Sequence, residues 1–212
     1  MQRRVRASKP RERPMRTVGS SREKTWPRIR TKGIDLICKT GFERMNLRKL
    51  AKESGIQVGS LYNYFSSKDE FLYKVICEIM SDLLATIEEA IEGTSNPVER
   101  LRIYVRTMVV WHCERRKEAY VSHNELKSLP KAGYNEVRSL RKRFEIILGD
   151  IVEKGCASGD FTVACRPVTV VAILNMLTSI SEWYRPSGAL RVELIVDTYE
   201  KLIGNMLLLK HQ

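Results

Sequence analysis

Between residues 47 and 65, polar side chains able to contact DNA bases alternate with apolar side chains able to form a helical core. The segment LRKLAKESGIQVGSLYNYF holds two short helical stretches separated by Gly55. This spacing is typical of a helix-turn-helix, whose second helix presents polar groups to DNA. The alternative is a helical hairpin that only packs against its neighbours. We expect Leu47, Leu50, Ala51, Ile56, Leu61 and Phe65 to point inward, and Gln57, Ser60, Tyr62, Asn63 and Tyr64 to point outward.

The charge distribution favours DNA binding by the first third of the chain. The formal net charge is +12 over 212 residues, and it divides unevenly along the sequence. Residues 1–28 carry a net +8 and residues 29–68 a net +5, whereas residues 69–212 carry a net −1. A basic region attracts phosphates, so we expect the N-terminal third to meet a polyanion and the remainder to do something else.

Motifs for catalysis and metal binding are missing from the sequence. The histidines, His112, His123 and His211, have no nucleophile motif around them, and no glycine-rich phosphate loop occurs. The five cysteines are widely spaced without a C-x-x-C pair, which suits a reducing compartment. No apolar run is long enough for a membrane span or a signal peptide. We therefore expect a cytoplasmic protein that is not an enzyme, requires no cofactor and has no membrane partner.

Helical periodicity and its punctuation predict an all-α fold. Residues 1–23 form a basic arm rich in Arg, Pro and Ser, without apolar periodicity. Residues 161–174 would also suit a strand, but the length of the apolar run that continues to Ile180 favours a buried helix. The expected helices lie at residues 29–40, 47–53, 58–65, 68–91, 98–117, 118–126, 131–154, 167–184 and 191–209, with glycine, proline or capping residues at their ends.

The run from Gly55 to Leu72, GIQVGSLYNYFSSKDEFL, closely resembles the signature of the tetracycline-repressor (TetR) family of bacterial transcription regulators. That signature has a glycine turn, a short recognition helix with an aromatic-x-aromatic-Phe end, and a Ser-Lys-acid helix start. Residues 29–42 resemble the first helix of the family, although Arg30 and Lys32 stand where apolar or small residues are commoner. The resemblance is strong over residues 26–79, and it extends to the rest of the chain only by length and helix pattern.

The resemblance implies a DNA-binding domain and a second, larger domain. It places an N-terminal three-helix DNA-binding domain at residues 24–70 and a C-terminal helical domain for effector binding and dimerisation at residues 71–212. Two phosphate contacts are expected from the start of a helix, at Arg48 and Lys68. The DNA-contacting residues implied are Arg48, Gln57, Val58, Gly59, Ser60, Tyr62, Asn63, Tyr64 and Lys68.

The last two predicted helices suit a homodimer interface, as the resemblance implies. Residues 168–181 contain no charged side chain and are apolar on more than one face. The last helix gathers Leu194, Ile195, Tyr199 and Leu202 on one side. Plain core packing is the alternative. A dimer with one helix-turn-helix per chain would bind a two-fold symmetric operator in double-stranded DNA.

A small-molecule effector is the expected signal for this regulator. Polar side chains on otherwise apolar helix faces are what a pocket needs in order to orient a ligand. The residues predicted to line it are Met108, His112, Arg141, Phe144, Asn175, Ser179 and Trp183. Residues 124–188 are similar to regulators of fatty-acid, steroid or aromatic catabolism, which implies a mostly apolar effector of the acyl-CoA thioester type.

Two functions remain open from the sequence. The first is a repressor that binds palindromic operator DNA as a homodimer and is released by its effector. The second is a DNA-bound structural or nucleoid-associated protein of the same fold, which needs no effector. A solvent-accessible apolar pocket would favour the regulator, and a filled core would favour the structural protein.

Overall fold

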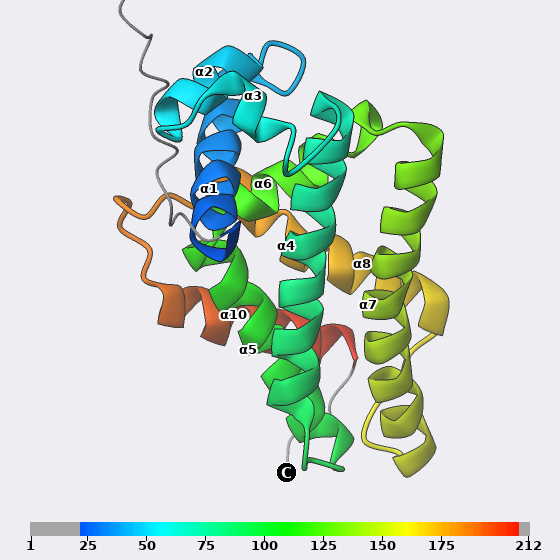
Figure 1. Ribbon diagram of the computed structural model, residues 1–212. Coiled ribbons are helices and arrows are strands. Elements are labelled where there is room, and N and C mark those ends of the chain that lie inside the picture. Colours follow the sequence, from blue (N-terminus) through cyan, green and yellow to red (C-terminus); the bar gives the residue numbers. More distant parts are fainter. Residues whose placement is uncertain (1–21, 208–212) are drawn as a thin grey trace, which may run out of the picture.

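The computed structural model describes residues 22–207, and every regular element in that range is helical (Figure 1). The all-α prediction is confirmed for this range, whereas the predicted basic arm lies outside it except for its last two residues. The elements are α1 (Arg22–Thr40), α2 (Leu47–Glu53), α3 (Val58–Leu61), α4 (Lys68–Ile91), α5 (Pro97–Glu114), α6 (Arg116–Asn124), a 3₁₀ turn η1 (Leu126–Ser128), α7 (Lys131–Ser158), α8 (Arg166–Thr178), α9 (Ile180–Trp183) and α10 (Val192–Met206).

The headpiece, by which we mean α1, α2 and α3, has separate start and stop signals for its helices. α1 ends before Gly41, whose φ of +77° is left-handed. α2 begins where the side chain of Asn46 accepts a hydrogen bond from the backbone N–H of Arg48. Gly55, with a φ of +65°, then turns the chain toward α3. The three helices share a core of Ile29, Leu36, Ile37, Leu50, Ala51 and Leu61.

α4 connects the headpiece to the rest of the molecule (Figure 1). It begins at the predicted place, where the Ser67 hydroxyl accepts a hydrogen bond from the backbone N–H of Glu70 at 3.0 Å. Along its length α4 contacts α5, α6 and α7. Its buried residues are Phe71, Leu72, Val75, Ile76, Ile79, Met80, Leu83, Leu84, Ile87 and Ile91. This one helix therefore links the headpiece to the remaining helices.

The C-terminal bundle, by which we mean α5 to α10, is organised around α5. This helix contacts α4, α7, α8, α9 and α10. Its apolar face is buried at 3,4 spacing by Leu101, Tyr104, Val105, Met108 and Val109. In Figure 1, α7 runs beside α4 and α10 crosses near α5. Within residues 22–207, no helix combines the length and the apolar character that a membrane crossing requires.

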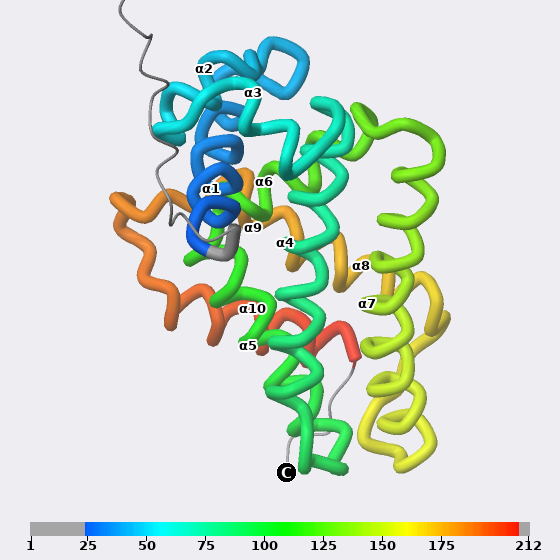
Figure 2. Tube along the Cα trace, in the orientation of Figure 1, coloured from blue at the N-terminus to red at the C-terminus, as the bar shows by residue number. Residues whose placement is uncertain are grey.

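α6 is the helix of the C-terminal bundle that packs against the headpiece. It contacts α1 on the headpiece side, and α4, α5 and α9 within the remainder of the fold. Figure 2 traces α6 and α9 side by side behind α1 and α4. This short helix therefore contacts the headpiece and other helices of the C-terminal bundle at the same time.

Several helix bounds differ from the predicted ones; α1 begins at Arg22 rather than residue 29, and α5 ends at Glu114 rather than residue 117. α3 ends at Leu61 rather than residue 65, because the N–H groups of Asn63 and Tyr64 bond to carbonyls three residues back, as in a turn. α7 passes through Gly155, where the Phe161 ring occupies the space of a side chain, and stops at Gly159, whose φ is +78°.

The predicted helix at residues 167–184 is divided into α8 and α9. At the junction, the Thr178 and Ser179 hydroxyls donate hydrogen bonds to the backbone carbonyls of Leu174 and Met176. Such side-chain bonds compete with the regular helical pattern. The preference for a helix over a strand at residues 161–174 is confirmed from Arg166 onward.

Candidate DNA interface and ligand pocket

The helix-turn-helix has a buried side and an open side, as predicted. Leu50, Ala51, Leu61 and Phe65 are buried, and Leu47 and Ile56 pack against the same core partly buried. Gln57, Tyr62 and Asn63 are exposed, with the Tyr62 ring 55% accessible, and Ser60 is half-buried. The exposed set also includes Arg48, Val58 and Gly59. The local core thus fixes a short helix whose outer surface is polar and open.

Tyr64 does not point outward as expected. It is half-buried, and its ring stacks on that of Trp26 in α1, with the centroids 6.2 Å apart and the planes at 14°. Its carbonyl oxygen accepts a hydrogen bond from the Lys74 ammonium at 2.6 Å. No local pattern predicts this contact, because the partner Trp26 lies 38 residues away in α1. Tyr64 therefore serves the packing of α1 against the turn.

Lys68 is also engaged within the protein. Its ammonium donates a hydrogen bond to the carbonyl oxygen of Glu43 at 2.8 Å and lies 4.4 Å from the centroid of the Phe42 ring. A lysine has three donors, so one bond leaves others for a phosphate. The contact holds the α1–α2 loop against the start of α4, beside the recognition surface.

The turn between α3 and α4 is stabilised by a charged cluster. The carboxylate of Glu70 accepts hydrogen bonds from the backbone N–H and hydroxyl of Ser66, and it pairs with Lys74 at 2.7 Å. The hydrogen bonds from Lys74 and Ser66 lower the pKa of Glu70 to about 2. This cluster fixes the direction in which α4 leaves the headpiece.

Arg30 occupies a position where the TetR resemblance favours a small or apolar residue, and acidic groups from two other helices surround it. Its guanidinium lies 3.3 Å from Glu78 and 3.7 Å from Asp82, both in α4, and 3.9 Å from Glu118 in α6. The Trp26 indole also donates to Glu78, at 2.7 Å. The charge that is unusual in α1 is thus balanced by α4 and α6.

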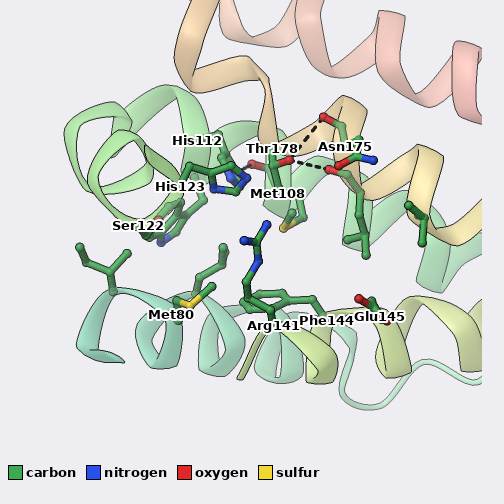
Figure 3. A pocket seen from close by; sticks show the side chains of 15 residues that line it. Met80, Met108, His112, Ser122, His123, Arg141, Phe144, Glu145, Asn175 and Thr178 are labelled. Atoms are coloured by element: carbon green, nitrogen blue, oxygen red, sulfur yellow. Dashed lines mark hydrogen bonds between the residues drawn. The ribbon is translucent and has the colours of Figure 1, made fainter. Parts of the chain in front are cut away.

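A cavity of about 110 Å³ lies between α4, α5, α6, α7 and α8, in the region where a ligand site was predicted (Figure 3). Apolar side chains form much of its wall, and histidine, arginine, hydroxyl and amide groups lie among them. It is lined by Ile79, Met80, Leu83, Met108, Trp111, His112, Ser122, His123, Arg141, Phe144, Glu145, Val171, Leu174, Asn175 and Thr178. Among residues 22–207 there is no group of three or more His, Cys, Asp or Glu side chains arranged to hold a metal ion.

Five of the seven residues predicted for the ligand site line this cavity: Met108, His112, Arg141, Phe144 and Asn175. The placement of Ser179 and Trp183 there was wrong. Ser179 lies at the break after α8, and Trp183 is 41% exposed on α9. A helix that continued unbroken would have carried both along the face of Asn175, and the break at Ser179 removes them from it.

Sequence reasoning missed the contribution of α6 to the cavity. Ser122 and His123 line it from this nine-residue helix, and Thr178 lines it from the end of α8. The only available signal was a histidine in a polar stretch. Nothing local indicates that α6 folds back against α4 and α5.

Both cavity histidines are held neutral near pH 7. His112 is 2% exposed, and its Nδ1 lies 2.7 Å from the Met108 carbonyl oxygen, to which it donates. Burial lowers the pKa of His112 to about 4. Burial, and then the charge of Arg141 and the nearby His112, lower the pKa of His123 to about 4. The Arg141 guanidinium is therefore the main positive charge facing the apolar space.

The faces of α8 and α10 that point away from the core are partly apolar. Val168 in α8 is exposed, as are Leu194, Leu202 and Met206 in α10, whereas the exposed Val171 lines the cavity instead. On the inner faces, Val170, Ile173, Leu177, Ile195, Val196 and Ile203 are buried. Exposed apolar side chains grouped on two neighbouring elements of a chain are typical of a protein interface.

Known proteins are similar to this chain in sequence and in fold. The HTH-type transcriptional repressor KstR2 of Mycobacterium tuberculosis is 26% identical over 172 residues, which cover 79% of this chain and 85% of the relative. The TetR-family regulator PfmR of Thermus thermophilus superimposes with a TM-score of 0.78 at 28% identity, over 87% of this chain and 100% of that one. AibR, solved with isovaleryl coenzyme A and operator DNA, gives a TM-score of 0.77 at 21% identity over 86% and 100% of the two chains.

Two family profiles cover most of the described residues. Residues 29–75 match the bacterial regulatory proteins of the tetR family, and residues 94–207 match the tetracyclin repressor-like C-terminal domain. The second match alone spans more than half of the chain. Together with the helix-turn-helix and its open polar face, these matches identify a DNA-binding transcription regulator rather than an enzyme. The chain belongs to the TetR family of transcription regulators.

Proposed function

We propose that this regulator is a repressor that binds palindromic operator DNA as a homodimer and is released when a small effector enters the cavity beside Arg141. The observation that carries the DNA-binding part is the open polar surface of α3, held on a buried local core. The observation that favours an effector is the cavity, because a DNA-bound structural protein of this fold has no need of one.

The headpiece supplies the operator contacts. Residues 24–70 form the DNA-binding domain and residues 71–212 the effector and dimerisation domain, a division supported by the two separate family matches. Within the DNA-binding domain, Tyr62 and Asn63 meet the major groove, and Lys68 holds a phosphate with the donors that Glu43 leaves free. The proposed contact set is Arg48, Gln57, Val58, Gly59, Ser60, Tyr62, Asn63 and Lys68, and it leaves out Tyr64, which packs on Trp26.

The dimer forms through α8 and α10. Their exposed apolar side chains would be covered by the same surface of a second copy, as a two-fold axis requires. Two headpieces then face two half-sites of the operator. Sedimentation should give a dimer at micromolar concentration, and a monomer with full operator affinity would contradict the proposal.

The effector is mostly apolar and belongs to the acyl-CoA thioester class. The apolar wall with scattered polar groups supports this choice, as does the isovaleryl coenzyme A bound to AibR, which shares the fold. Effector binding tilts α4, which contacts both the cavity-lining helices and the headpiece, and so alters the separation of the two recognition helices. By linkage, operator DNA must weaken effector binding by the same factor.

The DNA contacts are tested by substitution. Tyr62→Ala should weaken operator binding by about 1–3 kcal/mol without unfolding the protein, because the ring is exposed. Lys68→Ala should weaken all DNA sequences alike and flatten the salt dependence, whereas Asn63→Ala should reduce discrimination at particular base pairs. If Lys68→Ala and Asn63→Ala reduced discrimination between base pairs equally, the assignment of Lys68 to a phosphate and Asn63 to a base would be contradicted. Tyr120→Ala, an exposed tyrosine of α6, is the matched control for Tyr62→Ala.

The effector response is tested by titrating acyl-CoA thioesters with and without saturating operator. We expect saturating operator to lower the affinity for the effector, and the effector to lower the affinity for the operator by the same factor. An effector affinity that is the same with and without operator would exclude the coupling. It would leave the DNA-bound structural protein as the better interpretation.

A further inference from the structure

An unpaired arginine side chain reaches into the cavity. Arg141 extends from α7 into the space toward the α6 and α8 side chains (Figure 3). Within residues 22–207, its guanidinium has neither a hydrogen bond nor an ion pair, although it is partly buried. Other partly buried arginines are engaged, such as Arg116, which donates to the Ser181 carbonyl at 3.0 Å. A partly buried guanidinium without a protein partner is free to pair with an anion, so we expect a ligand to supply that anion here.

The groups around Arg141 cannot neutralise it. His112 and His123 are held uncharged near neutral pH, and the side chains of Ser122 and Thr178 are neutral. The one carboxylate that lines the cavity, Glu145, forms its ion pair with Lys142 instead. The site therefore has a net positive charge beside an apolar wall.

A second hollow shares part of the same wall. It has a volume of about 660 Å³ and has Arg141 and Glu145 in common with the first cavity. Its lining adds two further cations, Arg138 and Lys142, together with Leu126, Tyr134, Asn135 and Ser139. The inner cavity, at about 110 Å³, is smaller than the roughly 300–1,000 Å³ of a typical ligand pocket. A larger ligand would therefore extend past Arg141 into the outer, basic hollow.

We propose that the effector is an anionic amphiphile whose apolar part occupies the inner cavity and whose anionic group pairs with the Arg141 guanidinium where the two hollows meet. The inference rests on the proposed function only in taking this cavity as the effector site. A guanidinium binds a carboxylate and a phosphate in the same forked geometry. The anion is thus either the carboxylate of a free acid or a phosphate of a coenzyme A thioester, and the outer cation Arg138 distinguishes the two.

The test measures binding of hexanoate, hexanoyl-CoA and hexanol by calorimetry at fixed ionic strength. Arg141→Gln should weaken the anionic probe that binds by about 10- to 100-fold, because one charge-assisted pair is lost, and should leave hexanol unchanged. Arg141→Lys should recover part of the affinity. Arg143→Gln is the matched control on the same helix, because Arg143 pairs with Glu88 and lines neither hollow. Unchanged melting temperatures show that the variants fold.

The two sources of the anion separate in a second variant, Arg138→Gln, which leaves the Lys142–Glu145 ion pair intact. A thioester that places its phosphates in the outer hollow loses affinity in this variant, whereas a free acid that ends at Arg141 does not. The inference is overturned if neither anionic probe binds, if hexanol binds as tightly as they do, or if Arg141→Gln changes nothing. An anion that binds through Arg141 without altering operator affinity supports this inference and contradicts the proposed function.

Discussion

The headpiece and the cavity use their functional side chains in opposite ways. At the helix-turn-helix, residues 47–65 supply the exposed Tyr62 and Asn63 and, together with α1, the small core beneath them. In the cavity, the functional groups point inward, and they come from five helices spread from Ile79 to Thr178. The polar surface proposed to contact DNA therefore lies on one short segment, whereas the cavity proposed to bind a ligand depends on the packing of five helices.

Two glycines, one in the headpiece and one in the C-terminal bundle, provide the strongest test of this difference. A Cβ on Gly33 in α1 would lie 2.1 Å from Cζ of Phe71, and a Cβ on Gly155 in α7 would lie 2.1 Å from Cδ2 of Phe161. The surroundings differ. Phe71 is fully buried on α4 beside Phe65 and Trp26, whereas Phe161 follows the end of α7 in a non-helical segment. Both rings are buried, but we expect the non-helical backbone that carries Phe161 to shift more easily than a helix.

We expect Gly33→Ala to lower the free energy of unfolding by about 1–3 kcal/mol, since overpacking outweighs the gain in helix propensity. Operator affinity should fall with it, because α1 supports α2 and α3. Gly155→Ala should cost about half as much and leave operator affinity unchanged. Urea unfolding and DNA titration measure both quantities. Equal costs, or lost DNA binding from Gly155→Ala, would show that the two regions do not differ in this way.

The headpiece was largely predictable because its signals are local. Asn46, Gly55 and Ser67 begin or separate helices by interactions that reach only a few residues, and each does so at the predicted position. Tyr64 was misplaced because its partner, Trp26, comes from another helix. Even in the headpiece, prediction failed where a contact crossed between elements.

The cavity was predictable only in part, and for the same reason. Periodicity on α5 identified His112 and Met108 as inward-facing, and they line the cavity. Ser179 was lost because a hydroxyl-stabilised break redirected the chain after α8. His123 was missed because the position of α6 depends on α1, α4 and α9 together. Local sequence patterns indicate which face of a helix is buried, but they do not indicate which other helices pack against that face.

A pH experiment separates the regions, because they titrate in different windows. Burial lowers the pKa of His112 from 6.5 to about 4, so as pH falls through this range the unfolded chain gains a proton that the folded chain does not. Stability should decrease by up to about 1.4 kcal/mol per pH unit from this residue alone. At the start of α4, beside the headpiece, the pKa of Glu70 is lowered from 4.5 to about 2, so its contribution to stability is present above pH 4.5 and lost only below it.

His112→Asn is the variant to compare with the wild type, since asparagine keeps a donor near the Met108 carbonyl. Between pH 6.5 and 4.5, the free energy of unfolding of the wild type should fall more steeply than that of the variant. Glu70→Gln should alter only the slope below pH 4.5. Parallel curves for the wild type and His112→Asn across the upper window would mean that the cavity does not hold this histidine neutral.

The smallest expected effect concerns α6, which contacts both regions. From α6 the ammonium of Lys117 pairs with Asp35 of α1 at 2.6 Å, while Ser122 and His123 of the same helix line the cavity. The pair is exposed, so Lys117→Met should cost less than about 1 kcal/mol of stability. If α6 transmits ligand binding to α1, however, the factor by which effector lowers operator affinity should shrink, by about 0.5–1 kcal/mol of coupling.

Asp35→Asn should have the same effect, and the double variant should add nothing further, because both changes remove one interaction. Lys154→Met, which breaks an exposed pair with Asp150 within α7, should leave the coupling intact. A coupling factor that survives Lys117→Met unchanged would assign the communication between the two regions to α4 alone.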